Sequence, residues 1–153
     1  MGHTYTNLLY HGVFSTSHRR PVLPSLDLDS LTRVVGGIIR DRNGSLLAFN
    51  AAADHVHLLG VFHPQESISD MLDMFRDIKA ISSDWVHSRH PHAADFAWQR
   101  GYGAFSVSRS NAPAVIAYIA SQAGHHKTTT FEEEFIDFLK RHEIDYDPRY
   151  VFD

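Results

Sequence analysis

Two histidines separated by one residue are the first feature of this sequence that could do chemistry. His55 and His57 lie in the run Asp54-His55-Val56-His57-Leu58-Leu59, in which histidines and apolar residues alternate. This alternation predicts a β-strand in which the two histidines share one face, about 7 Å apart along the strand, while Val56 and Leu58 enter a core. Two neutral imidazoles so placed can bind one divalent cation. The same pair also fits two half-buried histidines with local hydrogen-bond partners and no metal.

A second pair of polar residues gives the histidines a chemical context. Tyr118 and Gln122 are four residues apart in a segment that predicts a helix, so they lie on one helix face, one turn from each other. Gln122 could add a carbonyl oxygen to a cation held by His55 and His57, which leaves open positions for a phosphate oxygen. The cation would make the phosphate electrophilic, and Tyr118 would attack it to form a phosphotyrosine. Taken singly, such a tyrosine is usually part of an amphipathic core, and such a glutamine is usually solvated.

The elements that must position these residues follow from the spacing of apolar side chains. Strands are predicted over residues 4–16, 45–53, 55–62 and 104–108. Helices are predicted over residues 27–41, 67–88, 111–124 and 130–140. The short link between the second and third strands predicts an antiparallel hairpin. The step Gly101-Tyr102-Gly103 suits a bend or a close approach of two backbones, and residues 144–152 are expected to be extended.

The order of the elements predicts the fold. The first six read strand, helix, strand, strand, helix, strand, which is the βαββαβ order of a ferredoxin-like α+β fold with an antiparallel sheet and its helices on one face. The helix that carries Tyr118 is an addition to this unit. At 153 residues the chain fits one domain with a single core.

Composition excludes several classes of function. The chain has no cysteine, which excludes a disulfide framework, a thiolate metal site and a cysteine nucleophile. Its hydrophobic content of 43% and charged content of 21% are ordinary for a globular protein. No apolar run is long enough to cross a membrane and no signal pattern opens the sequence, so we expect a cytoplasmic protein without a membrane partner.

The charge is unevenly distributed along the chain. The net charge is −4, but residues 131–153 alone hold eight acidic and three basic side chains, so residues 1–130 sum to +1. Basic side chains of this first part could form a face that contacts DNA phosphates; those we select are Arg19, Arg20, Arg100, Arg109 and Lys127. A mixed, solvated surface is an equally good interpretation of the charges alone.

Six motifs occur together along nearly the whole chain. They are Phe14-Ser15-Thr16-Ser17-His18-Arg19-Arg20-Pro21, Asp54-His55-Val56-His57-Leu58-Leu59, Trp98-Gln99-Arg100-Gly101-Tyr102-Gly103-Ala104-Phe105-Ser106-Val107-Ser108, Tyr118-Ile119-Ala120-Ser121-Gln122 followed by His125-His126, Phe131-Glu132-Glu133-Glu134-Phe135, and Tyr146-Asp147-Pro148-Arg149-Tyr150. In this order they resemble the single-tyrosine HUH transposases, that is, the REP-associated and related small insertion-sequence enzymes.

The resemblance implies roles for the residues already singled out. His55 and His57 would be the paired metal ligands, Gln122 the third ligand and Tyr118 the nucleophile. The cation would be Mg²⁺ or Mn²⁺. The fold would be of the HUH endonuclease type, with residues 1–130 as the catalytic domain and residues 131–153 as an acidic C-terminal helix and extension of the same domain.

The resemblance also implies a reaction and its partners. The protein would cut single-stranded DNA with hairpin ends, leave a 5′-phosphotyrosine and a free 3′-hydroxyl, and rejoin the strands without a nucleotide cofactor. It would act as a homodimer in which the tyrosine helix can complete the partner's metal site, with residues 109–112 as the hinge.

Two other functions remain open. A domesticated protein could keep the fold and bind DNA hairpins without cutting them. A histidine-triad nucleotide hydrolase also carries His-x-His on a strand, but it needs a third histidine two residues further on, where this chain has Leu59.

Overall fold

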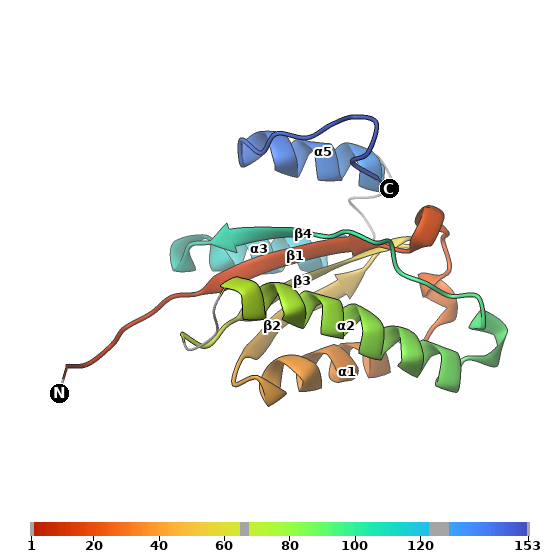
Figure 1. The fold of residues 1–153 in the computed structure, drawn as a ribbon, viewed down its shortest axis with the longest axis horizontal. Coiled ribbons are helices and arrows are strands. Elements are labelled where there is room, and N and C mark those ends of the chain that lie inside the picture. The colour runs from red at the N-terminus through yellow and green to blue at the C-terminus, as the bar shows by residue number, and fades with distance from the viewer. Residues whose placement is uncertain (1, 65–67, 123–128, 153) are drawn as a thin grey trace.

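A single antiparallel sheet forms the centre of the part of the chain that the structure, a computed structural model, describes: residues 2–64, 68–122 and 129–152 (Figure 1). Its strands are β1 (Leu9–Ser15), β2 (Ser45–Ala51), β3 (His55–Val61) and β4 (Gly103–Val107). They lie in the order β2-β3-β1-β4, and each neighbouring pair is antiparallel. With the two helices that connect the strands, this is the predicted ferredoxin-like βαββαβ fold, and the hairpin of β2 and β3 is confirmed.

Helices cover both faces of the sheet (Figure 1). The helices α1 (Leu28–Asp41) and α2 (Ile68–Arg89) pack on one face in the larger core. The helices α3 (Ala112–Ala120) and α5 (Phe131–Arg141) pack on the other face in two smaller clusters. No helix among the described residues combines the length and apolar character needed to cross a membrane.

Successive side chains of β1 point to opposite faces of the sheet and so belong to different cores. Phe14 enters the core beneath α1 and α2, whereas Leu9 and Val13 pack toward α3 and α5. The polar residue between them, His11, is buried on this second face. The strand therefore supplies packing residues to both faces, and it adds one buried imidazole to the face under α3 and α5, as the period-2 alternation of a strand requires.

The ends of the helices follow the local sequence. The Asp27 side chain accepts a hydrogen bond from the Ser30 N–H at 3.1 Å, and the Thr130 side chain accepts one from the Glu133 N–H at 3.2 Å. Both are ordinary N-caps, and they fix where α1 and α5 begin. The predicted end of the tyrosine helix at Gly124 lies outside the described residues.

A glycine lets α5 approach the sheet closely. A β-carbon on Gly103 would stand 2.8 Å from Cε2 of Phe135 and 3.0 Å from ring atoms of Phe105, so any other residue fits only if these rings shift. The nearest atoms belong to aromatic side chains and not to a second backbone, and this contact holds the first turns of α5 close to the sheet.

The expectation of an extended C-terminal segment is wrong. Residues 147–151 form a turn in which the Tyr150 N–H donates to the Asp147 carbonyl at 3.0 Å. The Asp147 carboxylate also accepts from the Arg149 N–H at 2.9 Å, a local bond that competes with extended backbone. The turn returns Val151 and Phe152 to the cluster beneath α5.

Candidate active site

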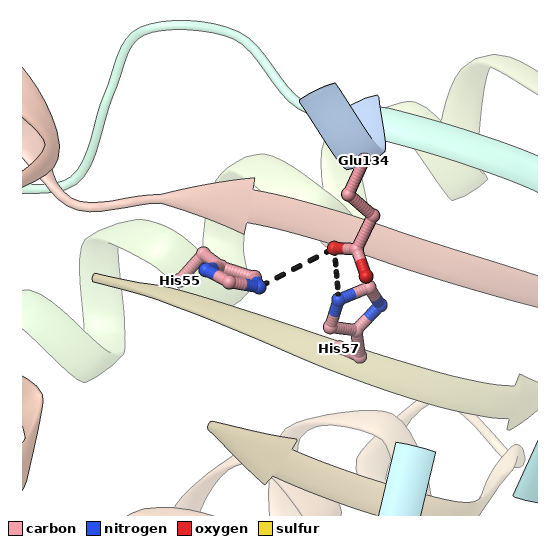
Figure 2. Close-up of side chains that lie close together, drawn as sticks. All are labelled: His55, His57 and Glu134. Atoms are coloured by element: carbon pink, nitrogen blue, oxygen red, sulfur yellow. Dashed lines mark hydrogen bonds and ion pairs between the residues drawn. The ribbon is translucent and has the colours of Figure 1, made fainter. Parts of the chain in front are cut away.

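The two histidines of β3 share one face of the sheet, as the alternation predicts. Both side chains are fully buried under α3 and α5, and their ring centroids are 5.2 Å apart. Each ring directs its Nε2 atom toward the same atom, Oε1 of Glu134 (Figure 2). The distances are 3.3 Å from His55 and 2.8 Å from His57. Two imidazoles and one carboxylate therefore meet at a point inside the protein.

Glu134 is the member of this group that sequence reasoning missed. It lies in the first turn of α5 and is only 4% exposed. A glutamate is rarely so buried unless it is paired. The sequence did contain a signal, because Phe131, Glu134, Phe135 and Phe138 have the spacing of an apolar helical stripe, which places one carboxylate among aromatic rings.

Tyr118 reaches the same carboxylate from the other helix on this face. Its hydroxyl donates a hydrogen bond to Oε2 of Glu134, while the histidines contact Oε1. Its ring lies edge-on to His57, with the centroids 5.7 Å apart. Tyr118 and the histidine pair, which are 61 to 63 residues apart in the sequence, thus meet at one side chain within one chain.

The position of Tyr118 is fixed by contacts of α3 with the sheet. Ile119 packs against β1 and β3, and the Asn50 side chain on β2 donates to the Ile119 carbonyl at 3.0 Å and to the Ala120 carbonyl at 3.2 Å. Gln122 is buried one turn beyond Tyr118, and its Nε2 donates to the Tyr118 carbonyl at 3.2 Å. The structure therefore places Gln122 beside the group, with its amide nitrogen turned to its own helix.

The charges in the group are strongly coupled. Burial alone would raise the pKa of Glu134, but hydrogen bonds from His55 and His57 hold this pKa far below its usual range. Burial would lower the pKa of His55, but its hydrogen bonds to Asp54 and Glu134 raise it. Burial, and then the Glu134 carboxylate, raise the pKa of Tyr118. The carboxylate is thus charged and the phenol is protonated at neutral pH.

The donor set fits a divalent cation. One ligand atom from each of His55, His57 and Glu134 lies within 4.8 Å of the others, and all three residues are buried. Two imidazole nitrogens and one carboxylate oxygen are ligands that first-row divalent metals accept.

A cavity of about 650 Å³ between α3 and α5 gives access to the group. Among the residues that line it are His11, Asn111, Tyr118, Glu134, Phe138 and Arg141. The phenol and the carboxylate can therefore be reached by a substrate, while the histidines lie beneath them.

The arginines selected as DNA contacts do not form one basic face. Arg19 and Arg20 follow β1, and Arg100 precedes β4, whereas Arg109 follows β4. Because β1 and β4 are antiparallel, Arg109 lies at the opposite end of the sheet from the other three. Lys127 lies outside the described residues. The four described arginines thus lie at two ends of the sheet, and their contacts with DNA stay a prediction.

Two of these arginines are already paired with carboxylates. Arg19 Nε lies 2.6 Å from Oε1 of Glu132 on α5, and Arg20 Nη1 lies 2.9 Å from Oδ2 of Asp95. Both pairs are partly or fully exposed, so they stabilise the fold little and can be exchanged for phosphate contacts.

The histidines in the last turn of α2 and in the segment that follows it have a structural role. The His87 ring contacts the Phe96 carbonyl at 2.7 Å, and the His92 ring contacts the Ser25 carbonyl at 3.2 Å. His90 Nε2 accepts from the Asp27 N–H at 3.0 Å. Each imidazole holds a backbone group, which explains the histidines without a metal.

Known proteins resemble this chain in sequence and in fold. The family model described as IS200-like transposase matches residues 4–122. No curated protein matches the sequence. A solved protein from Deinococcus radiodurans R1, described as a transposase, is 26% identical with a TM-score of 0.53, and the match covers 80% of this chain and 97% of that one.

A second solved structure resembles the fold. It is a REP-associated tyrosine transposase bound to a REP hairpin, with a TM-score of 0.60 and 16% identity, covering 82% of this chain and 73% of that one. At this identity the likeness shows a common fold alone. The family model, in contrast, spans most of the sequence and includes His55, His57, Tyr118 and Gln122. This chain therefore belongs to the family of IS200-like transposases.

Proposed function

We propose that this transposase cuts and rejoins single-stranded DNA at hairpin-flanked ends through a 5′-phosphotyrosine on Tyr118. One observation carries the proposal: the Tyr118 hydroxyl and both imidazoles of the His-x-His pair converge on the Glu134 carboxylate. A half-buried phenol that a substrate can reach, next to a donor set that fits a cation, is what nucleophilic attack on a phosphodiester needs.

We assign a divalent cation, Mg²⁺ or Mn²⁺, to His55 and His57, with Glu134 and Gln122 as the oxygen donors. Bound there, the cation would polarise the scissile phosphate. The buried position of the three groups with ligand atoms within 4.8 Å supports the assignment for His55, His57 and Glu134. Gln122 is proposed because it is buried one turn from Tyr118.

The bond changes then follow from the residues of this chain. The Tyr118 oxygen attacks the phosphorus, and the bond from phosphorus to the 3′-oxygen breaks. The phenol proton passes to solvent water, because the low pKa of Glu134 makes this carboxylate a poor base although it accepts the hydrogen bond from the hydroxyl. The 3′-oxygen takes a proton from solvent and leaves as a hydroxyl. Rejoining is the reverse, with a 3′-hydroxyl attacking the phosphotyrosine. No nucleotide is consumed, because each step exchanges one phosphodiester for another.

We propose that Arg19, Arg20, Arg100 and Arg109 contact DNA phosphates. Replacing Arg19, Arg20 or Arg100 singly by glutamine should reduce the slope of log affinity against log salt by about one unit, since each phosphate contact releases about one counterion. Titration of a labelled hairpin oligonucleotide at several salt concentrations measures the slope. Arg33→Gln is the matched control, because Arg33 is an exposed residue of α1 on the other face of the sheet. A slope equal to that of the wild type in all three variants would remove these arginines from the interface.

We also propose a homodimer that uses the outer face of α3. This face is apolar and exposed, and it consists of Pro113, Ala114, Ile116, Ala117 and Ala120. Uncovered apolar faces of this kind mark protein interfaces. Ile116→Glu should therefore give a monomer in sedimentation velocity at concentrations where the wild type is dimeric. Ile81→Glu, on the exposed side of α2, should leave the dimer intact. A wild-type monomer, or a dimer in both variants, would contradict this surface.

The same chain supplies the tyrosine, the histidines and the carboxylate, so we propose that residues 131–153 are an extension of the catalytic domain of residues 1–130 rather than a separate unit. A protein that acts on cellular DNA in this way would work in the cytoplasm.

Two alternatives give different results in one assay. A domesticated hairpin binder would retain hairpin DNA without a covalent adduct. A histidine-triad hydrolase would hydrolyse nucleotides, but the place of its third histidine is taken by Leu59, which is buried in the core. Incubation with single-stranded hairpin DNA and Mn²⁺, followed by denaturing electrophoresis, should show a covalent protein–DNA adduct. A protein that binds the DNA and forms no adduct would be the binder, and one that hydrolyses added nucleotides and forms no adduct would be the hydrolase.

A further inference from the structure

Each histidine of the pair has a different partner on its second ring nitrogen. His55 Nδ1 lies 2.6 Å from Oδ1 of Asp54, the residue that precedes it. His57 Nδ1 lies 2.8 Å from Nε2 of His11, which is on β1 and 46 residues away in the sequence. A carboxylate is the ordinary partner of a metal-binding imidazole, but a second imidazole is not.

We propose that His11 is a positioning residue that holds the His57 ring in one orientation both with and without a bound cation; this inference rests on the metal site proposed above. We do not assign His11 as a ligand, because its Nε2 atom is hydrogen-bonded to Nδ1 of His57. Its effect is on the direction in which His57 presents Nε2 to Glu134 and to the cation.

The hydrogen bond between the two imidazoles has to work in two directions. When His57 donates from Nε2 to Glu134, its neutral ring has an acceptor at Nδ1, and His11 Nε2–H is the donor. When His57 Nε2 coordinates a cation, Nδ1 carries the hydrogen and must donate it. A neutral imidazole is a donor at one nitrogen and an acceptor at the other, so His11 can satisfy both states by changing its tautomer. A carboxylate can only accept.

The surroundings of His11 keep its ring in place. It lies in the middle of β1, which is hydrogen-bonded to β3 on one side and to β4 on the other. Its ring packs edge-on to Phe138 at 5.2 Å and to Phe105 at 6.4 Å between centroids. It is 4% exposed, and burial disfavours the charged form of an imidazole.

A neutral partner also suits the substrate. Glu134 already places one negative charge against His57, and DNA brings a phosphate to the same place. A second carboxylate at position 11 would add repulsion close to the phosphate, whereas a neutral imidazole adds none.

The inference is tested by the affinity for Mn²⁺ of the full chain, measured by isothermal titration calorimetry. His11→Phe keeps an aromatic ring between Phe105 and Phe138 and removes the hydrogen bond. We expect it to bind Mn²⁺ about 10- to 100-fold more weakly, as is typical when an outer partner of a metal-binding histidine is lost. His11→Gln should recover most of the affinity, because an amide can donate or accept after a flip. If His11→Phe does not fold, His11→Met replaces it as the variant without a hydrogen bond.

His90→Phe is the matched control. His90 is also a buried histidine with a hydrogen bond, but its partner is the Asp27 N–H at the start of α1 and not a residue of the site. It should lower the melting temperature and leave the affinity for Mn²⁺ unchanged. The role of His11 is tested on the condition that His55→Ala abolishes Mn²⁺ binding. Two results would then overturn it: a wild-type affinity for Mn²⁺ in His11→Phe, or a loss of affinity in His11→Gln as large as that in His11→Phe. If His55→Ala binds Mn²⁺ as the wild type does, the proposed metal site itself is wrong.

Discussion

Replacing Tyr118 by phenylalanine should abolish the covalent protein–DNA adduct and reduce cleavage of single-stranded hairpin DNA by about 10⁴-fold or more, as loss of a nucleophile does in other covalent enzymes. The phenylalanine ring can keep the edge-on contacts with His57 and Phe138. Only the oxygen that attacks the phosphorus is lost. Cleavage of a labelled oligonucleotide under single-turnover conditions measures the effect.

Binding of the hairpin should remain close to that of the wild type in this variant. Tyr102→Phe is the control, since the Tyr102 ring stacks on Phe75 on the other side of the sheet at 4.9 Å and should change neither binding nor cleavage. If Tyr118→Phe still forms an adduct, another residue is the nucleophile and the proposed chemistry fails.

Replacing Glu134 by alanine should have the second largest effect, a loss of about 100-fold in affinity for Mn²⁺ together with a loss of cleavage. Glu134 is the carboxylate on which His55, His57 and Tyr118 converge. Its removal deletes an oxygen donor, and loss of an outer partner alone costs 10- to 100-fold. It also leaves buried polar groups without their acceptor, which should cost about 1–3 kcal/mol of folding stability each.

The neighbouring glutamate gives a matched control. Glu133 is exposed and belongs to the same helical turn, so Glu133→Ala removes the same charge from α5 without touching the histidines. It should bind Mn²⁺ with an affinity close to that of the wild type. Faster cleavage with unchanged Mn²⁺ affinity in Glu134→Ala would mean that this carboxylate excludes the substrate rather than holds the cation.

Much of the fold could be predicted from the sequence because its signals are local. The alternation around His55 and His57 and the apolar stripes of α1 and α5 depend on residues a few positions apart. The caps Asp27 and Thr130 act within one turn of their helices. Once the elements are known, the short links between them leave few ways to order the sheet.

The parts of the site that could not be predicted depend on contacts between elements distant in sequence. His57 meets Glu134 across 77 residues and His11 across 46. Which helix turn lies over which strand is decided by packing, such as the close approach of α5 at Gly103. A buried polar residue inside an apolar pattern, as at His11 and Glu134, is the one sequence signal that marks both.

The identity of the modified residue tests the account most directly. The protein is incubated with Mn²⁺ and single-stranded DNA that carries a hairpin and its flanking sequence, the adduct is digested with nuclease and protease, and the linked peptide is sequenced by mass spectrometry. The account predicts a 5′-phosphate of the cleaved strand on the oxygen of Tyr118, with a free 3′-hydroxyl on the other fragment. Cleavage that releases a free 5′-phosphate, or a nucleotide linked to any other residue, would contradict it.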